Sequence, residues 1–477
     1  MSAEERDSVL IKEHSPEQEE IRKAAFWIAT ISSFLTPFMG SAVNIALPSI
    51  GDEFSLKAVT LSWVSTVFLL SAAIGLVPIG RLSDIYGRKR IFLQGIVLYT
   101  FASLLCALAF SADMLILCRA LQGIGSAMIF GTGTAILVSV FPQQERGKVL
   151  GFNVAAVYFG LSVGPFAGGL FTQYGGWRSI FLINIPLGAF VIFLVRRKLN
   201  TEWLDAAGEK FDLSGSILYG AAVISFMYGF SILPGLPGLS LIAAGVILFI
   251  VFGFRETRSA NPVLDVGLFR ESRVFRYSNI AALINYSSTF AVGFLLSLYL
   301  QFMKGFSPFH SGLILASQPV MQSLFSPLAG RLSDRIEPRI IASSGMFLTF
   351  LSLLALVFLK SDTGLVYIIS ALIILGLGFA LFSSPNVNAI MSSVDRKFYG
   401  VASGILATMR MMGQTLSMGV VMLTFSVFIG GSPITAEHHP NLLTSMKTVF
   451  IVLTSLCFAG IFASSARGKM HEETRGV

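Results

Sequence analysis

The chain has 477 residues, of which 54% are hydrophobic and only 13% are charged, whereas soluble domains carry about 25% charged residues. A soluble protein of this length cannot bury so much apolar surface, so we expect the bilayer to be the solvent for much of the chain. The net charge of +8 would suggest a nucleic-acid partner if the basic residues formed one patch. They fall instead in the gaps between apolar runs, so we predict no nucleic-acid partner.

The chain begins with a polar, acidic segment that lacks the basic start and short apolar core of a signal peptide. We interpret residues 1–23 as a cytosolic tail. The three cysteines, Cys106, Cys118 and Cys457, each lie within an apolar run and show no paired spacing in loops. We therefore predict no disulfide framework, no metal site and no cofactor.

Fourteen apolar segments follow this tail, each close to or longer than the roughly 20 residues that cross a bilayer. Short turns containing Gly, Pro and Ser separate most of them. The predicted spans, in chain order, are 24–49, 59–79, 91–110, 113–139, 149–171, 179–196, 213–232, 237–254, 277–302, 309–329, 339–359, 364–386, 399–429 and 446–466.

The basic residues set the expected orientation, because cytoplasmic loops carry an excess of Lys and Arg. With a cytosolic N-terminus, 27 of the 34 basic residues fall on the inside and five on the outside. The remaining two, Arg119 and Arg410, lie within spans. We predict a multi-pass protein of the cell membrane with both termini in the cytosol.

The sequence repeats itself. The run GRLSD occurs at 80–84, at the end of the second span, and again at 330–334, at the end of the tenth. We therefore predict an all-α membrane protein built from two pseudo-symmetric six-helix bundles, with the seventh and eighth spans inserted between them. The predicted divisions are an N-terminal bundle at 24–198, a linker with the inserted helices at 199–276, a C-terminal bundle at 277–466 and a cytosolic tail at 467–477.

The turn after the second span carries the strongest motif. Its glycines permit close backbone approach, and the Asp84 carboxylate, which lies among cations, needs a partner such as the positive end of a helix. By the pseudo-symmetry we expect Asp84 to lie near 399–403, and Asp334 near 148–152. The pair would then latch the cytoplasmic face closed, whereas the plainer alternative is a solvated basic loop.

Several runs together resemble one family. The run at 80–90 resembles the signature loop of the major facilitator superfamily. Further runs resemble motifs of that superfamily or of its fourteen-helix drug–proton antiporter branch: RALQGIG at 119–125, GLSVGPFAGG at 160–169, WRSIFLINIPLG at 177–188, NIALP at 44–48, and Trp63. The resemblance implies a monomeric secondary transporter, not an enzyme, that moves a small-molecule substrate by alternating access. A multidrug or metabolite exporter with protons as the coupling ion is what that branch implies first.

One position departs from this pattern. The branch commonly carries an Asp five residues before Asn44, at a position associated with proton coupling or cationic substrates, and here that residue is Met39. None of the 26 acidic residues lies well inside a predicted span. The coupling ion and the cargo charge therefore stay open. The alternative is a transporter of organic anions or other metabolites, in either direction, without proton antiport.

Arg119 and Arg410 are the clear charges at depth, and such charges usually face a bundle interior or a wet cavity. Arg410 would lie roughly 15–18 Å into its helix. Because Arg can hold a carboxylate or phosphate with paired hydrogen bonds, we predict that neutral or anionic amphiphiles are preferred over cations. The alternative for both is a structural Arg bonded to backbone carbonyls.

The candidate site residues form two sets. Those expected to gate the protein are Gly80, Arg81, Asp84, Gly87, Arg88, Gly330, Arg331, Asp334, Gly164, Pro165 and Gly168, the last three because small residues allow close helix packing and Pro bends a helix. Those expected along the substrate or coupling pathway are Asn44, Trp63, Arg119, Gln122, Asn386, Asn388 and Arg410.

Other classes of membrane protein fit less well. An ATP-driven pump would need a P-loop, and the sequence contains no GK[ST] run. A membrane enzyme would need a catalytic cluster at depth, yet all five histidines fall in predicted tails or outer loops. The internal duplication argues against a channel or sensor.

Overall fold

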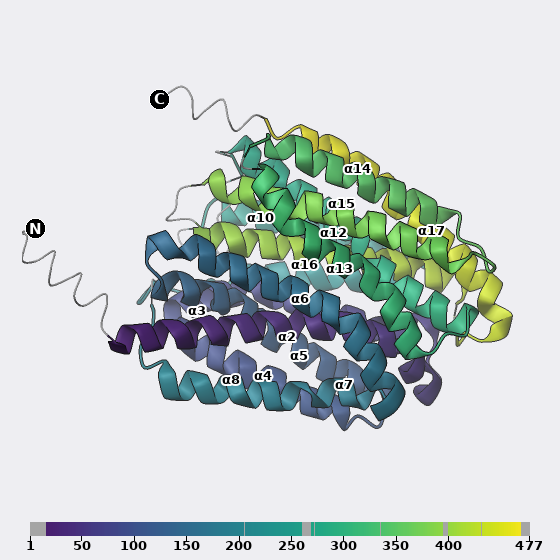
Figure 1. Ribbon diagram of the computed structural model, residues 1–477, viewed down its shortest axis with the longest axis horizontal. Coiled ribbons are helices and arrows are strands. Elements are labelled where there is room, and N and C mark those ends of the chain that lie inside the picture. The colour runs from purple at the N-terminus through teal and green to yellow at the C-terminus, as the bar shows by residue number, and fades with distance from the viewer. Residues whose placement is uncertain are drawn as a thin grey trace, which may run out of the picture.

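The structure is a computed structural model that describes residues 16–204, 206–259, 269–270, 272–333, 335–394, 399–430 and 432–468. Within these residues the regular structure is helical, apart from one isolated bridge between Lys57 and Pro433. The helices run side by side along one direction (Figure 1). This confirms the prediction of an all-α membrane protein.

The N-terminal half occupies the lower part of the view in Figure 1. The sixth span is interrupted, since α7 and α8 follow one another within the single apolar stretch Arg178–Lys198. The helices of this half are α2 (Pro16–Phe54), α3 (Ala58–Tyr86), α4 (Arg88–Ala107), α5 (Ala112–Val140), α6 (Gln143–Gly175), α7 (Arg178–Leu182) and α8 (Asn184–Lys198).

The C-terminal half lies above it in the same view, and two inserted helices come between the halves in sequence (Figure 1). The inserted pair is α9 (Leu213–Ser231) and α10 (Leu236–Glu256). The C-terminal half contains α12 (Arg273–Leu298), the short π-helix η1 (Tyr299–Met303), α13 (Pro308–Ser333), α14 (Pro338–Val357), α15 (Leu365–Ser392), α16 (Tyr399–Phe428), the 3₁₀ turn η3 (Ala436–His438) and α17 (His439–Ser465).

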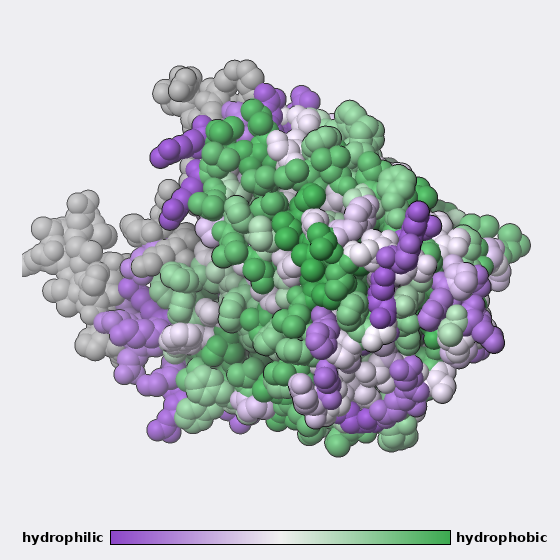
Figure 2. All heavy atoms as spheres, turned by 45° about the vertical axis from the view of Figure 1, so that its right-hand side comes forward, coloured by the Kyte–Doolittle hydropathy of each residue, from purple (hydrophilic) through white to green (hydrophobic). Residues whose placement is uncertain are grey.

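Thirteen segments among the described residues are long and apolar enough to cross a membrane. The fourteenth long helix of the bundle is α13, which lies between α6 and α15. It is less apolar because it carries Ser, Gln and Pro residues along its length. Figure 2 shows hydrophobic side chains across the middle of one face and hydrophilic ones gathered toward its two ends, as a bilayer requires.

In both halves, glycines allow two neighbouring helices to approach closely. In the N-terminal half, α4 and α5 approach so closely that a Cβ on Gly125 would lie 2.8 Å from the Tyr99 nitrogen. In the C-terminal half, α14 and α15 do the same, since a Cβ on Gly378 would lie 2.7 Å from the Thr349 nitrogen. Tyr99 and Thr349 are separated by the same 250 positions as the repeated GRLSD runs. The pseudo-symmetry thus extends into the helix contacts, whereas the predicted division points remain a prediction.

Helix α9 of the inserted pair contacts both α3 of one half and α16 of the other, along the seam where these two helices meet. The Tyr219 hydroxyl on α9 donates to the Ala73 carbonyl on α3, at 3.1 Å. Trp63 on α3 packs against Tyr228 on α9, with ring centroids 6.3 Å apart. At the start of α9, hydrogen bonds from Arg255 lower the pKa of Asp212 to about 2. These side-chain contacts tie α9 to α10 and to α3 of the N-terminal half.

Candidate functional site

A cavity of about 2180 Å³ lies between the two halves. Its walls come from α3, α5 and α6 on one side and from α12, α13, α15 and α16 on the other. It reaches Arg81, Asp84 and Arg146, which lie at the end of the bundle where α2 begins. We call this the terminal end, and the opposite end the far end.

At the far end the halves are joined by hydrogen bonds. Ser297 Oγ donates to the Asn44 carbonyl at 2.6 Å, and Gln301 Nε2 donates to the Ile45 carbonyl at 2.9 Å. The backbone nitrogen of Ala58 donates to the Ser432 carbonyl at 3.3 Å, beside the bridge between Lys57 and Pro433. The cavity is therefore open toward the terminal end and closed at the far end.

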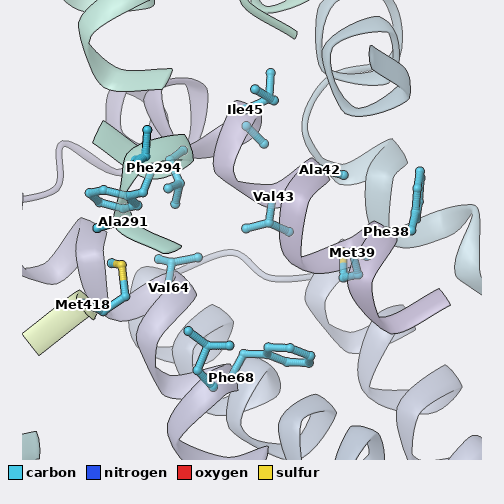
Figure 3. Close-up of a cluster of buried hydrophobic side chains, with 14 of the residues drawn as sticks. Phe38, Met39, Ala42, Val43, Ile45, Val64, Phe68, Ala291, Phe294 and Met418 are labelled. Carbon is cyan, nitrogen blue, oxygen red and sulfur yellow. The ribbon is translucent and has the colours of Figure 1, made fainter. Parts of the chain in front are cut away.

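A hydrophobic cluster also joins the halves (Figure 3). Val43 of α2 and Val64 of α3 lie toward Ala291 and Phe294 of α12, with Met418 of α16 close by. Met39 belongs to the same cluster and has an exposed fraction of 0%. The residue that stands where the branch carries Asp thus packs in an apolar core and offers the cavity no carboxylate.

Helix α6 is wedged between its own half and the opposite one. On one face, a Cβ on Gly168 would lie 2.7 Å from Ala42 Cα of α2, and one on Gly164 would overlap Ser41. On the other face, a Cβ on Gly312 of α13 would overlap the Pro165 carbonyl. The predicted Gly-Pro-Gly residues therefore lie where α6 meets both α2 and α13.

The predicted turn at 80–90 borders the terminal end of the cavity, and there α3 ends at Tyr86 and α4 begins at Arg88. Arg88 donates to the Asp84 carboxylate from Nε at 3.1 Å and from Nη2 at 2.9 Å, and it also donates to Ser139 Oγ at 2.6 Å. Arg81 pairs with Glu209 of the linker. Asp84 of the N-terminal half and Tyr399, the first residue of α16 in the C-terminal half, both line the cavity. The two predicted partners of the latch therefore border the same cavity.

The linker after α8 holds this loop in place. The Glu202 carboxylate accepts hydrogen bonds from the backbone nitrogens of Lys89 and Arg90, at 2.8 and 3.2 Å, and so caps the start of α4. Gly87 adopts φ +109° there, and a Cβ on it would lie 2.5 Å from Glu202 Cδ. Gly87 is thus required by its backbone conformation, and a side chain there would displace the Glu202 carboxylate from the start of α4.

Arg410 is a predicted pathway residue that lines the cavity. Its guanidinium carbon lies 5.5 Å from the centre of the Tyr286 ring on α12. No ion pair or hydrogen bond to it is found among the described residues, and its buried Nε has no partner there. Nearby, the Tyr158 hydroxyl on α6 bonds with Ser383 Oγ on α15, across the two halves.

Arg119 and Gln122 lie elsewhere, inside the N-terminal half. Arg119 has an exposed fraction of 1%; it donates to the Val64 carbonyl at 3.1 Å and to Gln122 Oε1, and it lies 4.3 Å from the Phe68 ring centre. Gln122 in turn donates to Ser103 Oγ at 2.7 Å. Neither residue lines the cavity. This arrangement fits the alternative of a structural Arg, which here bonds to one backbone carbonyl and to Gln122.

We expect Arg119→Ala to lower the melting temperature of the purified protein, because the Val64 carbonyl and Gln122 would lose a buried donor. Each such loss costs about 1–3 kcal/mol. Arg410→Ala is the matched control, since Arg410 has no hydrogen bond to lose among the described residues, and its melting temperature should stay close to that of the wild type. Equal melting temperatures for wild type and Arg119→Ala would contradict the structural role.

The other predicted residues are scattered around the cavity. Asn388 lines it and donates to Ser333 Oγ at 3.1 Å, and Gly330 also lines it. Asn386 is buried, Trp63 faces α9, and Asn44 belongs to the far-end closure. Arg331 lies in the last turn of α13, and Asp334 falls outside the described residues.

The sequence reasoning missed Tyr158, Tyr286 and Ser383. Each lies in an apolar span, where a hydroxyl is a weak sign of a cavity wall because it can equally bond within its own bundle. Tyrosines on the helices named by the motifs would have been the available signal. Within the described residues, no three His, Cys, Asp or Glu side chains gather as a metal site would need.

Comparisons with known proteins agree with this architecture. A family model described as the Major Facilitator Superfamily matches residues 29–418. The chain is 30% identical to the riboflavin transporter RibZ of Clostridioides difficile (strain 630), over 91% of this chain and 95% of that one. It is 32% identical to the multidrug resistance protein Stp of Mycobacterium tuberculosis (strain CDC 1551 / Oshkosh), over 83% and 74% of the two chains.

A solved structure shares the fold. It is described as a bacterial homolog to the human lysosomal transporter Spinster, in an inward-facing and unoccupied conformation. The TM-score is 0.65 at 16% identity, covering 95% of this chain and 98% of that one. At this level of sequence identity, the similarity supports a shared fold and nothing more.

Proposed function

Because the chain belongs to the Major Facilitator Superfamily and is a small-molecule transporter, we propose that it exports small organic molecules across the cell membrane by alternating access. The observation that carries this is the cavity of about 2180 Å³ between the halves, open at one end and closed at the other. In the opposite state the terminal end would close and the far end would open. One cavity would thereby serve both sides of the membrane in turn.

For cytosolic cargo to enter the cavity as it stands, the terminal end has to face the cytosol. This is supported by the basic residues that border the terminal end, because cytoplasmic loops are rich in Lys and Arg. Arg81, Arg88 and Arg146 line the cavity there. The names of the relatives favour organic cargo, since one is a riboflavin transporter and another a multidrug resistance protein.

Orientation can be tested in intact cells with single cysteines. Ser259 follows α10 at the terminal end, and Ser361 lies in the turn between α14 and α15 at the far end. In a variant without the three natural cysteines, an impermeant thiol reagent added outside should label Ser361→Cys and leave Ser259→Cys unlabelled. Labelling of the Ser259→Cys protein alone would reverse the topology.

Transport itself is tested in proteoliposomes. Riboflavin is a suitable first cargo because it is fluorescent, and a lipophilic dye should accompany it. We expect protein-dependent flux of at least one of them, blocked when the far end is cross-linked. The absence of flux across a broad set of organic cations, anions and neutral molecules would refute the proposal.

A second candidate is transport of organic anions or other metabolites without proton antiport. It is favoured by the cavity wall, where Asp84 at the mouth is the sole carboxylate among the described lining residues. An imposed pH gradient separates the two functions. Flux that follows the substrate gradient alone, and ignores the pH gradient, would support the second candidate.

A further inference from the structure

We propose that Arg410 is an anion-binding subsite, and that it selects planar aromatic molecules carrying a carboxylate or similar acidic group. This inference rests on the proposed function and names the cargo class. The subsite consists of Arg410 of α16, Tyr286 of α12, and the bonded hydroxyls of Tyr158 of α6 and Ser383 of α15.

The first step of the argument is that the Arg410 charge lacks a protein counterion. It takes part in no ion pair among the described residues, and its buried Nε has no hydrogen-bond partner there. Arg410 is the twelfth residue of α16, which places it roughly 17 Å from the start of that helix. A charge at such depth usually marks a substrate or ion pathway.

The second step is that no nearby carboxylate can compensate the charge of Arg410. Asp84 is the sole carboxylate among the described lining residues, and it lies at the mouth, where Arg88 already binds it. Met39 removes the other expected carboxylate. An incoming anion is thus the available partner, and a guanidinium can bind a carboxylate with two parallel hydrogen bonds.

The third step concerns the rest of the ligand. The Tyr286 ring lies 5.5 Å from the guanidinium carbon and packs edge-on against Phe379, with centroids 5.4 Å apart. The cavity wall also carries Phe130, Phe159 and Phe166. A flat aromatic body could stack on the Tyr286 ring while its acidic group bound Arg410.

The same arrangement explains how binding could drive the change of state. While the cavity is open, water can hydrate the guanidinium. When the halves close around it that water is lost, and an uncompensated charge becomes costly. A bound anion removes this cost, so the loaded protein should close more readily than the empty one.

The experiment uses two dyes with the same xanthene frame: fluorescein, which is anionic at neutral pH, and rhodamine 6G, which is cationic. Binding to the full chain in phosphatidylcholine nanodiscs is measured by fluorescence polarisation. We expect tighter binding of fluorescein than of rhodamine 6G. Arg410→Gln should weaken fluorescein binding about tenfold or more, as expected for loss of a charge-assisted bond, and should leave rhodamine 6G binding equal or tighter.

The matched control is Arg146→Gln. Arg146 also lines the cavity, but it lies at the mouth and donates to the Phe141 carbonyl at 3.0 Å. It should change fluorescein affinity less than about twofold, because its charge is distant from the subsite. Arg410→Lys keeps the charge and should bind fluorescein with intermediate affinity. Melting temperatures close to that of the wild type show that the variants are folded.

Each outcome decides the matter. Tighter wild-type binding of rhodamine 6G, equal loss of both dyes in Arg410→Gln, or equal effects of the Arg146 and Arg410 variants would overturn the subsite. Binding that depends on Arg410, with no flux of any of the tested cargoes in vesicles, would uphold the subsite and refute the transport function. Flux of rhodamine 6G without flux of fluorescein would uphold the transport function and refute the subsite.

Discussion

Leucine in place of Gly169 is expected to abolish transport while leaving the chain folded. Gly169 lies on the face of α6 that meets the opposite half, where a Cβ would lie 2.6 Å from the Pro308 carbonyl oxygen and 3.0 Å from Phe309 Cα. These neighbours belong to the start of α13 and cannot rotate away as a flexible side chain could. A larger residue therefore forces the halves apart at the far end, and the protein should be held open to the outside.

The readout is accessibility from outside. Val163 lines the cavity, so a single cysteine there should react with an impermeant thiol reagent faster in the Gly169→Leu protein than in the parent protein. Gly253→Leu is the control, because Gly253 has no heavy atom within 4 Å of an added Cβ. Wild-type riboflavin flux by Gly169→Leu would show that the contact between α6 and α13 is not part of the closure.

Gly164→Leu should behave differently, although it lies on the same helix. Its added Cβ would overlap Ser41 and lie 2.9 Å from the Phe38 carbonyl oxygen, both within its own half. This contact does not change when the halves move as rigid bodies. Overpacking there costs about 1–3 kcal/mol, so we expect a lower melting temperature rather than a change of accessibility.

Asp84→Asn is expected to reach the membrane at normal levels and to transport poorly. In this structure the terminal end is open, Asp84 is bonded to Arg88, and Tyr399 lies across the cavity mouth. When the terminal end closes, we expect the carboxylate to meet the N-terminus of α16, a contact worth about 0.3–2 kcal/mol. Asn keeps the shape but loses the charge, so flux should fall by up to about thirtyfold.

The control is Asp113→Asn, because Asp113 is exposed in the first turn of α5 at the far end, away from the cavity. It should transport like the wild type. The decisive comparison is flux per inserted molecule, measured for both variants. A wild-type rate of transport by the Asp84→Asn protein would refute the latch.

The sequence predicted the elements of the fold better than the directions of the side chains. Long apolar runs and the repeated GRLSD motif were sufficient for the spans and the two bundles. In a membrane, however, faces toward lipid and faces toward other helices are both apolar, so helical periodicity carries little information. The sequence did not show that Arg119 is buried within one half or that Arg410 faces the cavity.

Contacts between segments that are distant in the chain could not be predicted from the sequence either. The bonds from Glu202 to the start of α4 depend on how the linker folds back, which no local pattern encodes. Trp63 was expected along the pathway, yet it faces the inserted helix α9. The position of Trp63 depends on where α9 packs, and this packing involves α3, α9 and α16 together.

The most direct test of alternating access is a reversible cross-link at the far end. Lys57 and Pro433 are bridge partners on opposite halves, and such partners have Cα atoms about 4.5–5.5 Å apart, within the range of a disulfide. Cysteines at both positions, in a variant lacking the three natural ones, should form a disulfide under oxidation, stop riboflavin and dye flux, and regain it on reduction. Full flux in the fully cross-linked protein would contradict the account.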